Sequence, residues 1–119
     1  PGTDGLIAAV TLARGHDLYA QGFPRAAIVS LLAGVPGIER IHDVDLSLIP
    51  PRIEPKMQPV PMYEPRVALG HPAQNLHYAA WIARAANATD LSDRLLALSE
   101  AVGPVQPKFT TAPASPANL

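Results

Sequence analysis

Near the start of the chain, apolar residues recur every three or four positions, which is the spacing of one face of an α-helix. These residues are Leu6, Ile7, Val10 and Ala13. Thr3 and Asp4 precede them as plausible N-caps, so the pattern predicts a helix that runs to about Arg14 and ends at Gly15. A short strand is the alternative, because several of the residues are β-branched and glycines bound the run.

Residues 24–48 predict a helix, a tight turn and a strand. Pro24 suits the first position of a helix, and Gly34 with the following Pro-Gly pair suits its end. The apolar stripe of this helix has i, i+3, i+4, i+7 spacing and comprises Ile28, Leu31, Leu32 and Val35. From Val44 the pattern changes to period two, with apolar residues at 44, 46 and 48. That alternation predicts a half-buried strand with an acidic outer edge.

The region from Pro72 to Val102 predicts a helical hairpin. His71 suits the N-cap of the first helix, and this helix is expected to run to about Ala86. After a break, Asp90 and Asp93 resemble a capping pair. The second helix has a regular apolar stripe made of Leu91, Leu95, Leu98 and Val102. The pair Gly103-Pro104 ends it.

Prolines interrupt residues 50–65, so neither a helix nor a central strand can continue through them. The segment also carries apolar side chains: Ile53, Met57, Val60, Met62 and Tyr63. An extended, Pro-rich arm of this kind is expected to lie on a protein surface, its own or a neighbour's. The tail, residues 104–119, has Val105 and Phe109 as its sizeable apolar anchors and is expected to be disordered or bound by a partner.

Together these elements predict an α+β chain in four parts. They are a small α/β unit (1–49), the arm (50–65), the helical hairpin (66–103) and the tail (104–119). In a chain of 119 residues, the part able to form regular structure is near the size at which one hydrophobic core is only marginally stable. Much of its apolar content is alanine, which favours a subunit stabilised by partners over a self-sufficient enzyme.

Charge and composition narrow the function classes. The formal net charge is −1 and the sequence contains no run of Lys and Arg, so no nucleic-acid partner is expected. Cysteine is absent, which removes disulfides and thiolate chemistry. The longest apolar run, Leu6 to Leu12, is too short to span a bilayer. We expect a soluble protein, cytoplasmic or virion-associated, that holds no cofactor.

Candidate chemistry is sparse. His42, Asp43 and Asp45 are weak candidates for a metal or metabolite site, and the alternative is the solvated edge of a strand. No serine lies in a nucleophile elbow. An N-terminal proline is the base of tautomerase-like enzymes, but Pro1 is followed by a polar, glycine-containing segment instead of a strand.

An aromatic group marks the first helix of the hairpin. His77 and Trp81 are i, i+4 neighbours, and Tyr78 lies beside them. Two interpretations stay open, because Tyr and Trp serve both roles. The three residues form either an interaction patch or the ordinary packing of the hairpin. Catalytic residues are not assigned.

Two segments resemble known families. AAIVSLLAGVPGIERI, within residues 26–48, is similar to the C-terminal segment of phage baseplate J-like wedge proteins, where a helix, a V-P-G turn and a strand follow one another. That resemblance implies a non-enzymatic part of a contractile tail. GIERIHDVDL resembles a strand in the cytoplasmic domain of cation diffusion facilitators, which implies metal binding by His42.

The sequence therefore favours a non-enzymatic structural or assembly subunit of a larger complex, for instance a phage tail or contractile machine. Its partners would be other protein subunits, in a homo- or hetero-oligomer, bound through the arm, the tail and one helical face. A small accessory domain that binds a metal ion or metabolite is the alternative, and a small oligomeric enzyme is the third possibility.

Overall fold

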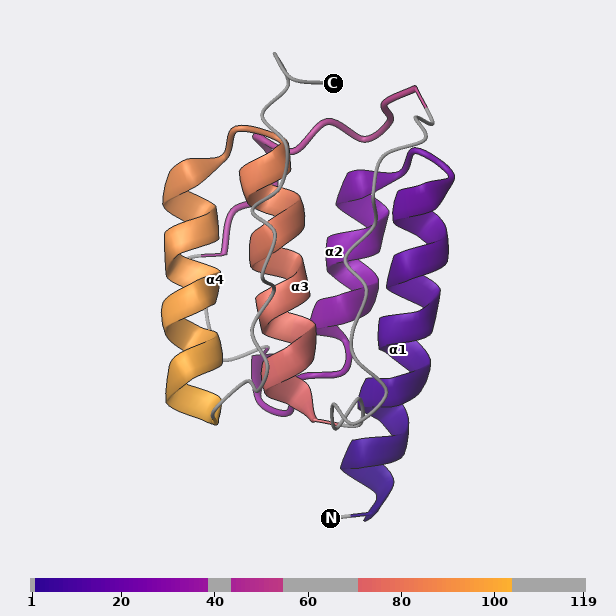
Figure 1. The fold of residues 1–119 in the computed structure, drawn as a ribbon, viewed down its shortest axis with the longest axis vertical. Helices are drawn as coiled ribbons and strands as arrows, with labels where there is room; N and C mark the ends of the chain where they lie inside the picture. The colour runs from indigo at the N-terminus through magenta and orange to yellow at the C-terminus, as the bar shows by residue number, and fades with distance from the viewer. Residues whose placement is uncertain (1, 39–43, 55–70, 104–119) are drawn as a thin grey trace.

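The computed structural model describes residues 2–38, 44–54 and 71–103, and in these residues it contains four α-helices and no strand (Figure 1). The helices are α1 (Gly2–Ala20), α2 (Pro24–Leu32), α3 (Pro72–Ala85) and α4 (Thr89–Val102). α1 packs on α2, α4 packs on α3, and α3 also contacts both α1 and α2. The prediction of an α+β fold is therefore wrong, and the described chain is all-helical.

The strand expected from Val44 is replaced by irregular chain and a turn. Asp45 accepts a hydrogen bond from the backbone N–H of Ser47 at 2.9 Å, and the N–H of Ile49 donates to the carbonyl of Leu46 at 3.0 Å. These local bonds close a turn, which competes with a sheet ladder for the same backbone groups. The apolar positions are used without a strand: Val44 and Leu46 pack partly buried against the core, and Ile49 is fully buried.

Three polar contacts hold residues 44–54 against the start of α2. The Arg25 Nε donates to the carbonyl of Ile49 at 2.8 Å. The N–H of Ile53 donates to the carbonyl of Gly22 at 2.8 Å. The guanidinium of Arg52 lies over the ring of Phe23, 5.5 Å from its centroid, at a distance typical of a cation–π contact. The first residues of the predicted arm therefore lie on the protein's own surface.

α1 is longer than its sequence pattern predicts, because Gly15 does not end it. A Cβ at position 15 would lie 2.7 Å from Cγ of Leu31, so the missing side chain allows α1 and α2 to approach closely. The helix ends instead at Ala20, and Gly22 follows it in the left-handed region, with φ 93°. There, the N–H of Phe23 donates to the carbonyl of Leu18 and the N–H of Gly22 to that of Tyr19, which is the hydrogen-bond pattern of a Schellman motif.

The predicted starts of α2 and α3 and the buried stripe of α2 are confirmed. Pro24 and Pro72 are the first residues of their helices. The imidazole Nδ1 of His71 accepts a hydrogen bond from the N–H of Ala73 at 3.1 Å, which makes His71 the N-cap of α3. The stripe is buried as expected: Ile28, Leu31 and Leu32 lie in α2, and Val35 lies beyond its end.

The helical hairpin is confirmed, but its turn differs from the prediction. Asn87 has φ 66° and occupies the left-handed position at the end of α3, as the N–H of Ala88 donates to the carbonyl of Ala83 at 2.9 Å. α4 then begins at Thr89, with Ala88 as an N-cap that makes no side-chain hydrogen bond. The capping pair predicted from Asp90 and Asp93 is therefore wrong, since Asp90 already lies in the first turn of the helix.

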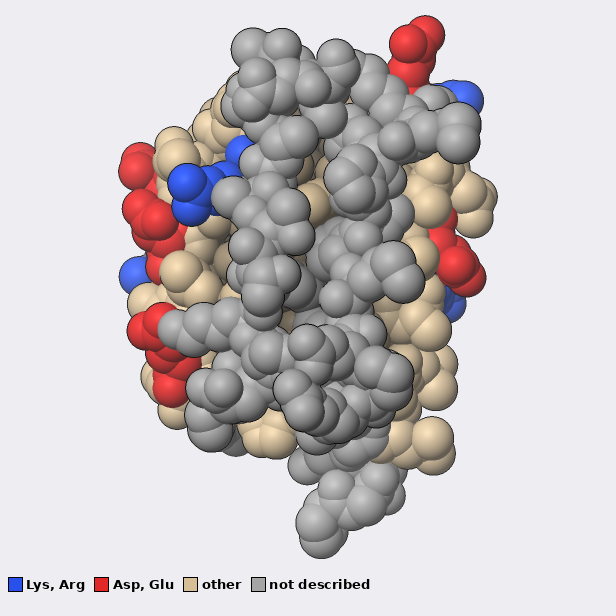
Figure 2. Space-filling model, in the orientation of Figure 1, with Lys and Arg blue, Asp and Glu red and all other residues tan. Residues whose placement is uncertain are grey.

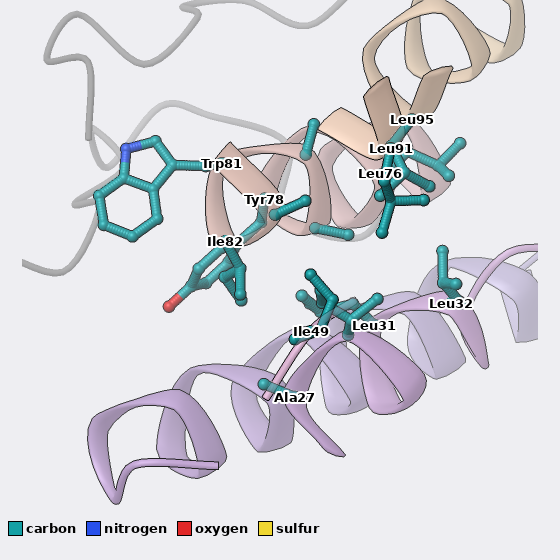
Figure 3. Close-up of a cluster of buried hydrophobic side chains, with 14 of the residues drawn as sticks. Ala27, Leu31, Leu32, Ile49, Leu76, Tyr78, Trp81, Ile82, Leu91 and Leu95 are labelled. Carbon is teal, nitrogen blue, oxygen red and sulfur yellow. The ribbon is translucent and has the colours of Figure 1, made fainter. Parts of the chain in front are cut away.

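The core surrounds α3, which is buried continuously from Ala73 to Ala83. Figure 3 shows Leu76 of α3 beside Leu91 and Leu95 of α4, with Leu31 and Leu32 of α2 facing them. Ile49 lies next to Leu31 in the same view, so the loop after α2 also fills the core. The remainder of the arm, residues 55–65, and the tail lie outside the described residues, and the division into four parts stays a prediction.

Candidate functional site

Asn75 joins three helices through a buried polar contact. Its side chain is fully buried, and its Nδ2 donates to Oγ1 of Thr11 at 2.9 Å and to the carbonyl of Leu31 at 3.0 Å. The Thr11 hydroxyl donates in turn to the carbonyl of Ile7 at 2.7 Å. One amide of α3 thus ties α1 to α2.

Glycine at position 34 makes this junction possible. A Cβ there would collide with Oγ1 of Thr11 and Nδ2 of Asn75, so the end of α2 can lie against the junction only without a side chain. The sequence signal was present but not used: Gln74 and Asn75 are polar residues in the middle of an apolar helical run. The groups in this junction are amide, hydroxyl and carbonyl, so its chemistry is structural rather than catalytic.

Aromatic rings form a second connection between α1 and α3. Tyr19 and Trp81 meet edge to face with centroids 5.6 Å apart, and Trp81 meets Tyr78 at 6.4 Å. Tyr78 also meets the ring of His16 at 6.2 Å. Edge-to-face pairs at these distances are favourable. Sequence reasoning found Tyr78 and Trp81 but did not find their partners on α1.

Burial keeps both phenols of this group neutral. It raises the pKa of Tyr19 to about 12. The pKa of Tyr78 is also raised, mainly by burial and further by the nearby Tyr19 and Asp17. Both phenols are therefore protonated at neutral pH and do not act there as general bases. The contacts that these rings make are packing contacts between α1 and α3.

The predicted interface residues fall into two groups. His77, Tyr78 and Trp81 are buried, which agrees with the packing interpretation rather than with an exposed patch. Figure 3 shows the Trp81 ring directed away from the group of leucines, at the end of the cluster. Ile53 is half-buried against the core. The others lie outside the described residues and stay predictions: Met57, Val60, Met62, Tyr63 and Phe109.

The metal candidates gain no support from Asp45. It is exposed, and the hydrogen bond from the N–H of Ser47 lowers the pKa of its carboxyl group. Part of its acceptor capacity is therefore used in a local turn. His42 and Asp43 lie outside the described residues. No group of three possible metal ligands occurs within residues 2–38, 44–54 and 71–103.

The outer side of α1 exposes apolar side chains to solvent, which is unusual for a helix in a small bundle. Leu6, Ile7 and Val10 are 66%, 43% and 59% exposed, and their i, i+3, i+4 relations place them together. Figure 1 shows that the N-terminal end of α1 extends beyond the other three helices. The sequence between Leu6 and Ala13 contains no charged residue. We call Leu6, Ile7 and Val10 the α1 patch.

Charged side chains lie elsewhere on the face shown in Figure 2. Acidic groups line the outer side of α4, whose carboxylates are Asp90, Asp93 and Glu100. Sequence reasoning placed the residues of the α1 patch on one helical face and did not identify the face that α1 buries. That face carries Ala8, Leu12, Gly15 and Tyr19.

Comparison with known proteins gives no relatives: no family model, no curated protein and no solved structure matches the chain significantly. None of the helices in the described part of the chain has both the length and the apolar character needed to cross a membrane.

Proposed function

We propose that this chain is a non-enzymatic assembly subunit that binds a helix of another protein subunit through the α1 patch. The observation that supports this proposal most is that Leu6, Ile7 and Val10 are exposed next to one another. They lie on a helix that extends beyond the other three. Burial of such side chains removes apolar area from water and stabilises association. An apolar group on the surface of a small protein is a common sign of a binding site.

The form of the patch favours a helix as the partner. It is a stripe within two turns of α1, without charge, and Ala9 and Ala13 lie beside it. Small residues next to larger apolar ones allow a second helix to approach closely, with side chains of one helix between those of the other. Binding through the arm and the tail is part of the same proposal and rests on their apolar residues alone.

The resemblance of residues 26–48 to baseplate J-like wedge proteins suggests a contractile tail as the kind of assembly. The helix and the Pro-Gly turn of that pattern occur here as α2 and residues 33–38. The strand that should follow is absent from residues 44–49. The proposal of an assembly subunit therefore rests on the α1 patch more than on this resemblance.

Site-specific photocrosslinking in the native host tests the proposal. A photoreactive residue at position 6 or 10 should crosslink to one discrete partner, and Val10→Glu should abolish the crosslink formed from position 6. Val29 on α2 is a matched control, because it is apolar and 53% exposed but lies on another helix. Equal crosslinking from positions 6 and 29, or a crosslink that survives Val10→Glu, contradicts the proposal.

A further inference from the structure

His71 contacts the start of one helix and the end of another. Its Nδ1 accepts the hydrogen bond from the N–H of Ala73 at 3.1 Å and so caps α3. The other side of the ring meets Gly103 at the end of α4, where a Cβ would lie 2.8 Å from Cε1 and 3.2 Å from Nε2 of His71. The imidazole therefore fills the space between the two helix ends.

Glycine at position 103 is required by this contact and not by the backbone. Gly103 has φ 169° and ψ 165°, an extended conformation that any residue adopts. A methyl group at this position would displace the imidazole, and the displaced ring would lose its hydrogen bond to Ala73. His71 and Gly103 are thus matched to each other.

Protonation removes the ability of His71 to cap the helix. Neutral imidazole has one acceptor nitrogen, whereas the protonated ring has two donors and no acceptor. The added positive charge also lies at the N-terminus of α3, the positive end of the helix dipole. Histidine is the side chain whose ordinary titration falls between about pH 5 and 8.

We propose that His71 is a pH-sensitive latch. In its neutral form it holds the start of α3 against the end of α4, and on protonation it releases both ends. The released residues are those at which the chain enters the hairpin from the arm and leaves it into the tail. Acidification therefore loosens the hairpin at its open end, where α3 begins and α4 ends.

The charged groups on the two packed helices set the direction of the response. The first turn of α3 contains no acidic residue, and two titratable side chains of this helix, His77 and Tyr78, are buried. The last turn of α4 contains no basic residue and carries Glu100. A protonated imidazole leaves the N–H of Ala73 without its cap, whatever charge lies nearby. The stabilisation by His71 is therefore present at neutral pH and is lost as the pH falls.

Four forms of the full chain test the latch: wild type, His71→Asn, His71→Ala and Gly103→Ala. Asparagine caps a helix and does not titrate, so His71→Asn is the matched control. The measurements are the protection factor of the Ala73 amide against hydrogen exchange and the melting temperature, at pH 7.5 and 5.5. The other three histidines are present in both wild type and His71→Asn, so the difference between these two forms reports on His71.

In wild type, the protection factor of Ala73 should fall about fivefold on acidification, which is the loss expected for a helix cap. The melting temperature should fall by about 4 °C more than in His71→Asn. Gly103→Ala should show the low protection already at pH 7.5. If wild type and His71→Asn respond equally to pH, or if Gly103→Ala keeps full protection at Ala73, the latch is wrong. His71→Asn and Gly103→Ala, each compared with wild type, give a result even if His71→Ala does not fold. None of the outcomes depends on a partner at the α1 patch.

A Glu100→Gln variant separates the cap from the surrounding charge. The latch requires that Ala73 protection still falls on acidification in this variant, because the lost acceptor lies on His71 itself. A pH response that disappears with Glu100→Gln would show that the carboxylate, and not the cap, carries the effect.

Discussion

α3 and α1 distribute polar and apolar residues in opposite ways. α3 buries polar side chains, including Asn75 and His77, whereas α1 exposes Leu6, Ile7 and Val10. In α3, the amide nitrogen of Asn75 donates hydrogen bonds to acceptors on α1 and α2, which offsets part of the cost of its burial. On α1, the three apolar side chains face solvent, and the helix partner proposed above would cover them. The comparison is thus between a helix that is buried within the bundle and a helix that is apolar on its solvent side.

The largest expected effect comes from truncating the same residue type on both helices. Leu76→Ala should lower the free energy of unfolding by about 3 kcal/mol, because Leu76 is fully buried in the core. Leu6→Ala should change it by less than about 0.5 kcal/mol, since Leu6 is mostly exposed. Urea denaturation of both variants measures the difference. Similar losses would mean that the isolated chain already covers the α1 patch.

The buried polar junction gives the next effect. Asn75→Ala should lower the free energy of unfolding by about 2 kcal/mol, because it removes two hydrogen bonds and leaves the buried carbonyl of Leu31 without the Asn75 donor. Arg14→Ala on the exposed side of α1 is the control and should stay within about 0.5 kcal/mol of wild type. An Asn75 variant as stable as this control would show that the junction contributes nothing.

Gly15→Ala tests whether the close contact between α1 and Leu31 outweighs the gain in helix propensity. Helix propensity alone predicts stabilisation by about 1 kcal/mol. The contact with Leu31 predicts a net loss of about 1–2 kcal/mol, because the buried leucine cannot move away. Thermal or urea unfolding gives the sign. Adding Leu31→Val should recover part of the loss, and a stabilised single variant would rule out the close approach of α1 and α2.

A further expected effect appears only at alkaline pH. Because burial raises the pKa of Tyr19 to about 12, the folded protein stays fully stabilised below pH 10 and loses this contribution as the pH rises toward 12. Ultraviolet absorbance should show a tyrosine ionisation step near pH 12 that is missing in Tyr19→Phe. A Tyr19 that ionises near pH 10 would mean that α1 does not bury it against Trp81.

Sequence periodicity was a good guide where one residue fixes one helix end. Pro24, His71 and Pro72 gave the starts of α2 and α3 correctly, because a ring or a side-chain acceptor acts locally. Gly15 was misread as a helix end, since a glycine that serves close packing looks the same in sequence as one that ends a helix. The alternation from Val44 was misread as a strand because a turn can use the same apolar positions.

The candidate site was less predictable than the fold. The exposed side of α1 depends on which face α2 covers, and that choice rests on Gly15 and Gly34, which carry no hydrophobic signal. The junction at Asn75 joins residues that are far apart in sequence, so no local pattern contains it. The aromatic residues of α3 were found, but their burial follows from the position of α1.

The anchoring of Ile49 has a consequence for variation in the chain. Because Arg25 and the core fix this residue, the long connection from α2 to α3 is divided into two shorter loops. The entropic cost of closing a loop rises by only about 0.6 kcal/mol for each doubling of its length. Insertions or deletions between residues 55 and 70 should therefore leave the helices in register, so the length of this segment can diverge while the bundle stays the same.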